Sequence, residues 1–337
     1  MSTIKEVAKL AGVSVSTVSR AISGNAYVEE EKRQKVMEAI TKLNYKPNQM
    51  ARGLRAGKTY TLALMIPDIN SLYYPMIMRS IEQEVSKKDY ALILCNNSEN
   101  LETEKKNLEM LMQRKVDGIF CMSVSDDIRH LITASREVPV VLLNRNFDDI
   151  CCVSYDNEDG AYKMVKYLLE QGHRRIAGVF GDFRIQRYRT RYDGCKRAME
   201  EYGISDYKKY FIYDVTTTDE AYLRTMDMLE RKDKPTAFFA SLDIVAIGIY
   251  SAVYKSGLSI PGDISVVGYD NIDISNYLTP PLTTYNASTG KIAQEAVRCM
   301  FKLMESNKPS NYEHVVLIGD VKERMSVGNV CEEGTGA

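Results

Sequence analysis

The stretch IKEVAKLAGVSVSTVSRAIS, residues 4–23, holds two short segments of helical periodicity, 4–11 and 15–22. Two helices that cross steeply at a tight turn need a small residue where they touch, and Ala8 provides it. The turn needs a residue that tolerates positive φ, and Gly12 provides that four positions later. The stretch therefore predicts a helix-turn-helix.

The second of these helices has the features of a helix that reads DNA. Val18 is placed to face the first helix, and Ser14 can cap the second through its hydroxyl. The outer face then offers Val15, Ser16, Ser19 and Arg20. Arginine suits guanine, serine suits several bases, and valine suits the thymine methyl group. The alternative is an ordinary three-helix bundle that binds nothing.

The charge distribution favours DNA binding over that alternative. Residues 1–60 contain eleven lysines and arginines and five glutamates, which gives this segment a charge of +6. Since the whole chain carries -1, residues 61–337 carry -7. A basic head on an acidic body indicates that the head meets a polyanion.

A third helix is predicted from about residue 29 to 43, and Pro47 then breaks the pattern. Residues 49–56 could form a brief helix. The following Gly57-Lys58-Thr59 is similar to the end of a phosphate loop, but the glycine that would open the loop is replaced by Arg52. The strand-like run also comes after this segment instead of before it, so a nucleotide-hydrolysing enzyme is not expected.

From residue 61 onwards, short β-type runs alternate with amphipathic helical stretches. The runs span residues 61–67, 91–97, 118–124, 139–144, 175–181, 209–215, 235–241, 263–270 and 314–320. Such alternation predicts doubly wound parallel sheets with helices on both faces. The length suits two similar lobes that divide near residues 151–156. A ligand cleft is expected where the strand ends of the two lobes face each other.

Composition excludes several other classes of protein. The 337 residues are 45% hydrophobic and 26% charged, as in soluble globular proteins, and no apolar run approaches a membrane span. The N-terminal MSTIKEVAKL lacks the layout of a signal peptide, so we expect a cytoplasmic protein with no membrane association. The seven cysteines form no CxxC pair, and the three histidines have no metal-ligand spacing. We expect no metal and no cofactor.

Three functions remain to be weighed: a DNA-binding regulator, a ligand-binding protein without DNA function, and an α/β enzyme acting on sugars or nucleotides. The helix-turn-helix argues against the second. No G-x-S-x-G, no phosphate loop, no G-x-G-x-x-G after a strand and no close histidine–acid pair supports the third. We therefore expect no enzymatic activity and no catalytic residues.

At this point the sequence resembles a known family. TIKEVAKLAGVSVSTVSR and NYKPNQMARGLR are similar to the DNA-binding head and hinge of the lactose-repressor (LacI/GalR) family of bacterial transcription regulators. Further similar segments follow in family order: IPDINSLYYPMI, VDGIF, PVVLLNR, DNEDGAY, GHRRIAGVFG, PTAFFASLDIVAIG, ISVVGYDN and PPLTT. The resemblance covers nearly the whole chain, through about Val327.

The resemblance implies a hinge helix after the head. In this family two such helices, one per subunit, pair in the minor groove at the centre of a pseudo-palindromic operator. The leucine that wedges between base pairs would be Leu54, with Arg55 beside it and Ala51 on the close-packing face. A helix of about eight residues is not stable alone in water, so it would need its partner and DNA. The alternative is a plain linker.

The expected organisation follows from these points. Residues 1–47 form the DNA-binding domain, 48–60 the hinge helix and linker, and 61–337 the effector-binding and dimerisation body. The chain should cross between lobes near 151–160 and near 280–290. The residues expected to contact DNA are Thr3, Ser14, Val15, Ser16, Thr17, Ser19, Arg20, Asn25, Tyr45, Asn48, Ala51, Leu54 and Arg55.

The body resembles periplasmic sugar-binding proteins, and in relatives its cleft binds a sugar, sugar phosphate or purine. The residues expected to contact the effector are Tyr73, Tyr74, Arg145, Asp156, Arg191 and Asp243. Asp243 could accept paired hydrogen bonds from sugar hydroxyls, or could only cap the following helix. Arg191 suits a carboxylate, phosphate or diol, or could pair with a structural acid. Tyr73 could stack on the ligand or pack in the core.

Two departures from the family bear on the effector. Relatives commonly have Asn-Pro before the paired aromatics, whereas this chain has Ser71-Leu72, which removes an amide often used for ligands. The loop 182–191 is unusually basic, which favours either an anionic effector or a solvated helix start. The resemblance implies a repressor controlled by a carbohydrate-derived effector. Because the tail has no heptad repeat, a homodimer is expected.

Overall fold

The computed structural model describes residues 2–23, 27–45, 57–306 and 312–330. The chain divides into two compact units, Met1–Tyr60 and Thr61–Ala337, which we call the head and the body. The predicted contacts at Asn25, Asn48, Ala51, Leu54 and Arg55 lie outside the described residues.

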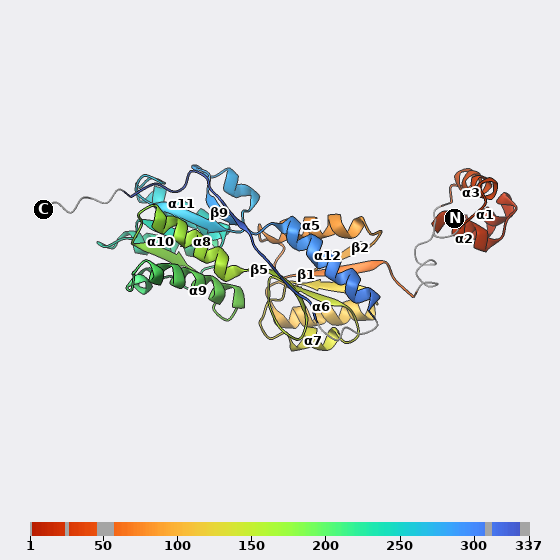
Figure 1. Ribbon diagram of the computed structural model, residues 1–337, viewed down its shortest axis with the longest axis horizontal. Helices are drawn as coiled ribbons and strands as arrows, with labels where there is room; N and C mark the ends of the chain where they lie inside the picture. Colours follow the sequence, from red (N-terminus) through yellow and green to blue (C-terminus); the bar gives the residue numbers. More distant parts are fainter. Residues whose placement is uncertain (1, 24–26, 46–56, 307–311, 331–337) are drawn as a thin grey trace. The chain divides into compact units, whose positions relative to one another are not determined.

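The head consists of three helices around a small apolar core (Figure 1). Their bounds are α1 Ile4–Ala11, α2 Val15–Ser23 and α3 Glu30–Lys42. Val18 and Val36 are fully buried in this core together with Ala8. Gly12 ends α1 in the left-handed conformation with φ of 65°, which confirms the predicted turn glycine.

Two hydroxyl caps fix the start of the first two helices. Thr3 and Glu6 form a reciprocal capping box on α1, in which the Thr3 amide donates to the Glu6 carboxylate over 2.7 Å. The Ser14 hydroxyl accepts the Thr17 amide over 3.2 Å at the start of α2, which confirms the cap predicted there.

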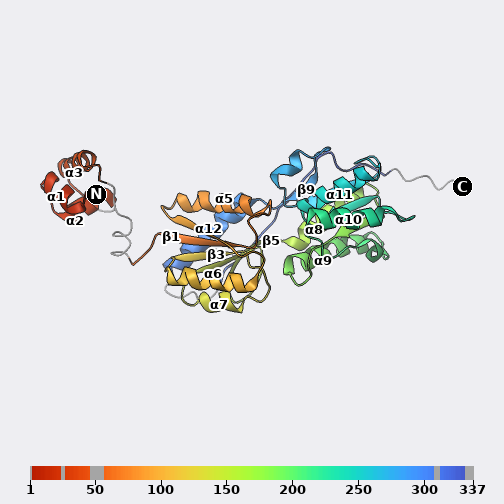
Figure 2. The same ribbon diagram turned by 180° about the vertical axis from the view of Figure 1, so that it is seen from behind.

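The body contains two lobes, each built on one sheet. In lobe 1 the strand order is β10-β5-β4-β3-β1-β2, and all pairs are parallel. Its strands are β1 Thr61–Ile66, β2 Ala91–Asn96, β3 Gly118–Cys121, β4 Val140–Leu143, β5 Cys151–Tyr155 and β10 His314–Leu317. Its helices are α5 Tyr74–Ser86, α6 Leu101–Gln113, α7 Arg129–Ala134 and α12 Thr289–Glu305. Helices α5 and α12 cover one face, and α6 and α7 the other (Figure 2).

Lobe 2 has the strand order β11-β9-β8-β7-β6, parallel except for the β11–β9 pair. Its strands are β6 Ile176–Val179, β7 Ala237–Ala240, β8 Ser265–Tyr269, β9 Thr283–Asn286 and β11 Asp320–Lys322. Its α-helices are α8 Asn157–Glu170, α9 Gln186–Glu201, α10 Thr218–Leu229 and α11 Asp243–Lys255. Two 3₁₀ helices are η1 Tyr207–Tyr210 and η2 Asp273–Asn276.

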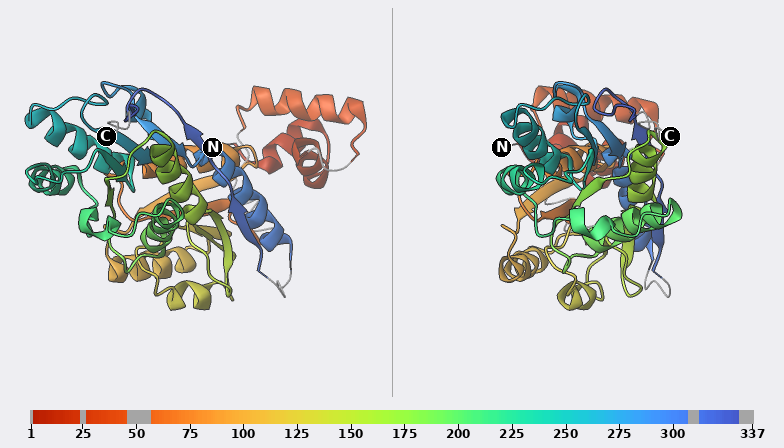
Figure 3. Two further views of the ribbon diagram at one scale, coloured as in Figure 1. Left: turned by 60° about the vertical axis from the view of Figure 1, so that its left-hand side comes forward. Right: turned by 90° about the vertical axis from the view of Figure 1, so that its left-hand side faces the viewer.

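The chain passes between the lobes three times. It leaves lobe 1 after β5, returns between β9 and α12, and leaves again between β10 and β11. The C-terminal blue segment therefore runs along both lobes (Figure 3). The run 314–320, expected as one strand, is divided between the two sheets at Gly319, whose amide donates to the Tyr285 hydroxyl over 2.7 Å.

One predicted strand is wrong. Residues 209–215 form the end of η1 and a single β-bridge between Ile212 and Val179. The apolar run is still explained by burial, because Tyr210, Phe211 and Ile212 all pack in the core beside β6. Of the described helices, none is long and apolar enough to cross a membrane.

Candidate functional site

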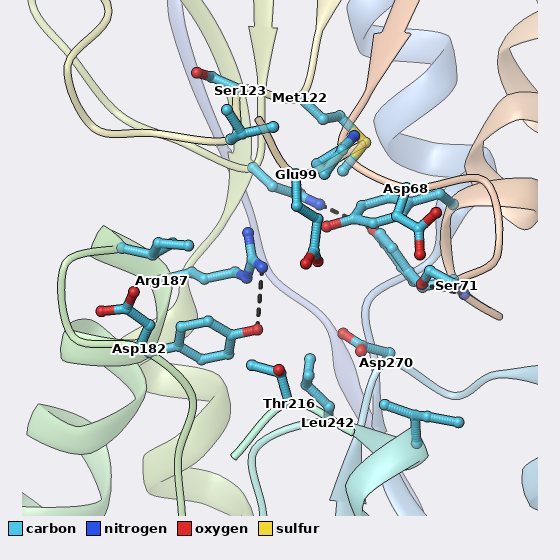
Figure 4. A pocket seen from close by; sticks show the side chains of 18 of the residues that line it. Asp68, Ser71, Glu99, Met122, Ser123, Asp182, Arg187, Thr216, Leu242 and Asp270 are labelled. Carbon is cyan, nitrogen blue, oxygen red and sulfur yellow. Dashed lines mark hydrogen bonds between the residues drawn. The ribbon is translucent and has the colours of Figure 1, made fainter. Parts of the chain in front are cut away.

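A cavity of about 700 Å³ lies between the lobes of the body, at the carboxyl ends of their parallel strands (Figure 4). From lobe 1 it is lined by the segments that follow β1, β2, β3 and β4. From lobe 2 it is lined by the segments that follow β6, β7 and β8. This is the position at which open α/β sheets bind ligands, because loops from several strands converge there. Its size suits a small molecule.

The predicted residues Tyr73, Tyr74, Arg145 and Arg191 all line this cavity. The two tyrosine rings stand edge to face, with centroids 5.8 Å apart, at the start of α5. The Asn144 side-chain amide donates to the Tyr73 hydroxyl over 3.1 Å. Burial raises the pKa of both tyrosines, so both stay neutral at physiological pH. They offer ring faces and neutral hydroxyl groups to a ligand.

Arg191 is fixed in place before any ligand binds. Its Nε donates to Asn157 over 2.9 Å, and its Nη2 forms an ion pair with Asp270 over 3.5 Å. The guanidinium also lies 3.5 Å from the centroid of the Tyr269 ring. With 5% of its surface exposed, Arg191 presents a rigid edge to the cavity instead of a mobile side chain.

Asp270 is a cavity acid that the sequence analysis did not identify. It follows β8 and lines the cavity, and its charge contributes to the raised pKa of Tyr73. Burial raises the pKa of Asp270 to about 6, although the Arg191 and Arg187 guanidinium groups lower it. Its φ of 112° is strained for a residue other than glycine, and Asn144, another cavity residue, has φ of 55°. Such strain is commonly found at functional sites.

Asp243, expected as an effector contact, lies in a different position. It does not belong to the cavity lining, and it is only 1% exposed. Its carboxylate accepts hydrogen bonds from the Ile272 amide, the Ser275 hydroxyl and the Thr284 hydroxyl, over 3.0, 2.7 and 2.6 Å. It therefore holds η2 against β9. A Cβ at Gly268 would lie 2.1 Å from its Oδ1, which explains the glycine in β8.

Asp156, also expected as an effector contact, caps a helix. It is the N-cap of α8, where its carboxylate accepts the Asp159 amide over 2.9 Å, and it is not among the residues that line the cavity. A carboxylate at a helix N-terminus is favoured by the helix dipole and by the free amides. Its role is to start the helix that follows the first lobe crossing.

Behind the lobe 1 wall lies a buried carboxylate, Glu104 of α6. It accepts hydrogen bonds from the Ser123 hydroxyl over 2.7 Å and the Val124 amide over 2.8 Å. Asn97 donates to it over 3.0 Å, and a ring nitrogen of His130 lies 2.8 Å away. Because Ser123 and Val124 line the cavity, this network fixes the shape of its wall.

Two polar contacts join the lobes at one side of the cavity, and we call them the interlobe clasp. Asp126 of lobe 1 pairs with Arg189 of lobe 2 over 2.8 Å. The Gln186 side-chain amide donates to the Asn146 carbonyl, and its oxygen accepts the Asn146 amide, both over 3.0 Å. These contacts join the two lobes of the described body, an arrangement that we call closed.

Most of the DNA-contact residues predicted in the described part of the head lie on or next to α2. Ser14, Ser16 and Arg20 are exposed, and Val15, Thr17 and Ser19 are half-buried. The Ser14 hydroxyl lies 2.7 Å from that of Ser16 and 2.8 Å from that of Thr17. Thr3 is exposed beside α1, and Tyr45 is half-buried against the head core. The exposed face of α2 is short, polar and basic, as a major groove requires.

The cavity residues that sequence reasoning missed share a recognisable position. Asn144, Asp270 and Ser123 each stand at or just after the end of a predicted strand. Reading each predicted strand for a polar residue at its carboxyl end would have found them. Within the described residues, no group of three or more histidine, cysteine or acidic side chains could hold a metal ion.

Comparison with known proteins gives two family matches. Residues 3–48 match the family described as bacterial regulatory proteins, lacI family, and residues 165–327 match the periplasmic binding protein-like domain. The HTH-type transcriptional repressor PurR of Histophilus somni (strain 129Pt) is 33% identical over 331 residues. That alignment covers 97% of this chain and 99% of the relative.

Solved structures of similar proteins cover the same length. The Lac repressor dimer bound to operator and the anti-inducer ONPF has a TM-score of 0.84 at 25% identity and covers 97% of this chain and 99% of its own. The complex of the transcriptional regulator CelR with cellobiose has a TM-score of 0.73 at 26% identity. The match covers 97% of this chain and 100% of the CelR chain. Similarity therefore extends through head and body alike.

Proposed function

The chain belongs to the lacI family of bacterial regulatory proteins, and we propose that it represses transcription by binding an operator as a homodimer under the control of a small effector. The observation that carries this proposal is the presence, in one chain, of a capped helix-turn-helix and a cavity between two lobes that polar and aromatic side chains line. The protein is a regulator and not an enzyme. We place it in the cytoplasm, where bacterial DNA lies.

The head reads the operator in the major groove. The exposed Arg20 is suited to guanine, and Ser16 and Ser19 can donate to or accept from several bases. Thr3 and Ser14 also hold helix starts, so their part at the DNA would be to position α1 and α2 against the backbone. The residues Asn25, Asn48, Ala51, Leu54 and Arg55 are assigned to DNA contact through the family resemblance.

The effector binds in the cavity of the body. Tyr73, Tyr74, Arg145 and Arg191 remain its proposed contacts, and Asp270 takes the place that had been given to Asp243. Ring faces beside fixed hydrogen-bonding groups suit a polyhydroxylated molecule. One structural relative was solved with cellobiose, which supports a carbohydrate-derived effector for this chain.

The dimer surface of the body is proposed on lobe 2. Large apolar side chains are exposed there on Leu223 of α10, Tyr254 of α11 and Tyr277 after η2, to 61%, 45% and 79%. Tyr254 donates to the Thr279 carbonyl, which brings α11 beside the segment that carries Tyr277. Apolar groups gathered in this way are typical of a protein contact. A second copy of the chain is the partner, as in the dimeric relative.

The experiment that tests the proposal is a gel shift on DNA from the region upstream of the gene. The full chain should bind specifically, and deletion of residues 1–60 should abolish binding. Leu54→Ala should weaken binding to the operator, because a wedge that unstacks a base step is lost. Val316→Ala, which removes an exposed apolar side chain from β10 of the body, is the matched control and should bind normally. Specific binding that survives both the deletion and Leu54→Ala would contradict the proposal.

A further inference from the structure

Four arginines lie in the loop and helix start at residues 182–191, and three of them already have acidic partners. Arg184 pairs with Asp182 over 2.6 Å, Arg189 with Asp126 and Arg191 with Asp270. Arg187 differs: within the described ranges it forms no ion pair. Its Nη2 donates to the Tyr188 hydroxyl over 3.0 Å, and its guanidinium points into the cavity (Figure 4).

Arg145 brings a second cation to the same cavity from the opposite lobe. It is 2% exposed, and its Nη2 donates to the Ser123 carbonyl over 3.0 Å. Its one acidic neighbour is Asp126, 3.3 Å from its Nε, and that carboxylate also serves Arg189. The contact is poorly directed, because neither Arg145 Nε nor Asp126 Oδ1 forms a hydrogen bond of good geometry. Arg145 and Arg189 therefore share the Asp126 carboxylate.

The two guanidinium groups interact unfavourably across the cavity. Burial and then the charge of Arg187 lower the pKa of Arg145 to about 10. Tyr74 lies within the electrostatic range of both arginines, which places them around the same tyrosine. Like charges that face a low-dielectric space raise the free energy of the empty site, and an anion between them removes that cost.

The acids of the cavity lining lie within reach of this pair, but their ion pairs and hydrogen bonds are to other groups. The Asp270 carboxylate is within electrostatic range of Arg187. Asp270 is paired with Arg191, and the Asp68 carboxylate accepts the amide of Asn70 over 3.1 Å. Glu99 is exposed to solvent. These carboxylates are acceptors suited to hydroxyl groups. The lining therefore offers both donors for an anion and acceptors for hydroxyl groups.

We infer that the effector carries a phosphate or carboxylate group that binds between Arg187 of lobe 2 and Arg145 of lobe 1. This inference rests on the proposed effector function of the cavity. An anion held in this way contacts both lobes at once. It would therefore favour the closed arrangement over any arrangement in which the two arginines separate.

Isothermal titration of the full chain with matched compounds tests the inference. The panel is glucose, glucose 6-phosphate and glucuronate, with ribose, ribose 5-phosphate and inorganic phosphate. At least one anionic sugar should bind about tenfold or more tightly than its neutral parent, since a hydrogen bond to a charged group is lost in the parent. The phosphate and carboxylate arms distinguish the two anions. Inorganic phosphate should compete if the group is a phosphate.

Arg187→Gln should remove the preference for the anionic member of each pair. Arg197→Gln is the matched control, because Arg197 lies on the same helix and pairs with Glu158 outside the cavity lining. The control should keep the preference. Equal binding of neutral and anionic sugars, or no binding by any anionic compound, would overturn the inference. So would a preference that survives Arg187→Gln.

The operator gel shift separates this inference from the proposed function. If the chain binds its operator, and a neutral sugar binds with the same affinity as its phosphate, the proposed regulatory function is upheld and the anion site is contradicted. If an Arg187-dependent anion binds but the head binds no DNA, the anion site stands and the function fails.

Discussion

Asp243 and Asp270 show how two neighbouring buried acids in one lobe take different roles. Asp243 uses both carboxylate oxygens inside the protein, on the Ile272 amide and on two hydroxyls. Asp270 uses one carboxylate oxygen for the ion pair with Arg191, and it lines the cavity. A carboxylate whose acceptor sites are filled by the fold has little capacity left for a ligand. For this reason the structural acid should affect stability, and the cavity acid should affect binding.

We expect Asp243→Ala to lower the free energy of unfolding by about 1–3 kcal/mol, because it leaves a buried amide and two hydroxyls without their acceptor. The pH dependence should change as well. Burial and then the charge of Asp270 raise the pKa of Asp243 to about 7, above the ordinary value of 3.8. Its contribution to stability is therefore full below about pH 4 and is lost as the pH rises through about 7.

Asp243→Asn cannot titrate, so its unfolding free energy should fall less steeply than that of the parent chain between pH 4 and 7. Some slope should remain, since the pKa of Asp270 is also raised. Urea denaturation at several pH values measures both variants. Asp273→Asn, which changes an exposed carboxyl of the same segment, is the control. An unchanged slope in Asp243→Asn would show that Asp243 is ionised throughout this range.

At the scale of elements, the sequence predicted the head more completely than the body. Gly12 and Ser14 act locally, on the turn and on the first amides of α2, so their chemistry is visible in the sequence. Residues 209–215 have the composition of a strand, but they meet β6 through one bridge only. Whether an apolar run pairs along its length depends on its neighbours in space, which residue type does not encode.

The same limit explains the cavity residues. Tyr73 and Arg191 were predicted through the family resemblance, and Arg145 because it follows a predicted strand, and all three line the cavity. Asp243 also follows a strand, yet its side chain turns towards η2 and β9. The direction of a side chain at a strand end is set by the partners that the fold brings to it. Those partners, Ser275 and Thr284, are about 30 to 40 residues away in sequence.

The α2 helix carries a prediction of its own. Arg20→Ala should weaken binding to the operator by about 1–3 kcal/mol and should affect random DNA much less, because a base-edge contact is lost. Fluorescence anisotropy on operator and on random DNA of equal length measures both. Arg33→Ala removes the same charge from the exposed surface of α3 and is the control. Equal losses on the two DNAs for Arg20→Ala would assign Arg20 to the phosphate backbone instead.

For the whole molecule, function requires that the arrangement of the lobes and the occupancy of the cavity depend on each other. The cavity is lined from both lobes, so a ligand that contacts both must prefer one arrangement. By linkage, the effector changes operator affinity by the same factor by which the operator changes effector affinity. The interlobe clasp is therefore expected to bias this equilibrium.

Arg189→Gln removes the charged half of the clasp, Arg189–Asp126. We expect the open arrangement to become more populated, so that the apparent affinity for the effector falls about 2- to 5-fold, the range of a partly exposed ion pair. Titration with the tightest-binding sugar of the panel measures this loss. Hydrogen exchange should also become faster in residues 182–189 and 123–127, which the clasp holds together.

A matched pair inside one lobe separates the clasp from a general loss of charge. Lys163→Gln breaks the ion pair with Asp159, 2.6 Å long, within α8 of lobe 2. It should leave both effector affinity and exchange at residues 123–127 unchanged. If Arg189→Gln and Lys163→Gln behave alike, the clasp has no influence on lobe closure. If only Arg189→Gln weakens effector binding, its operator affinity at a fixed effector concentration must change as well. The change must be opposite in direction to the change that the effector causes in the parent chain.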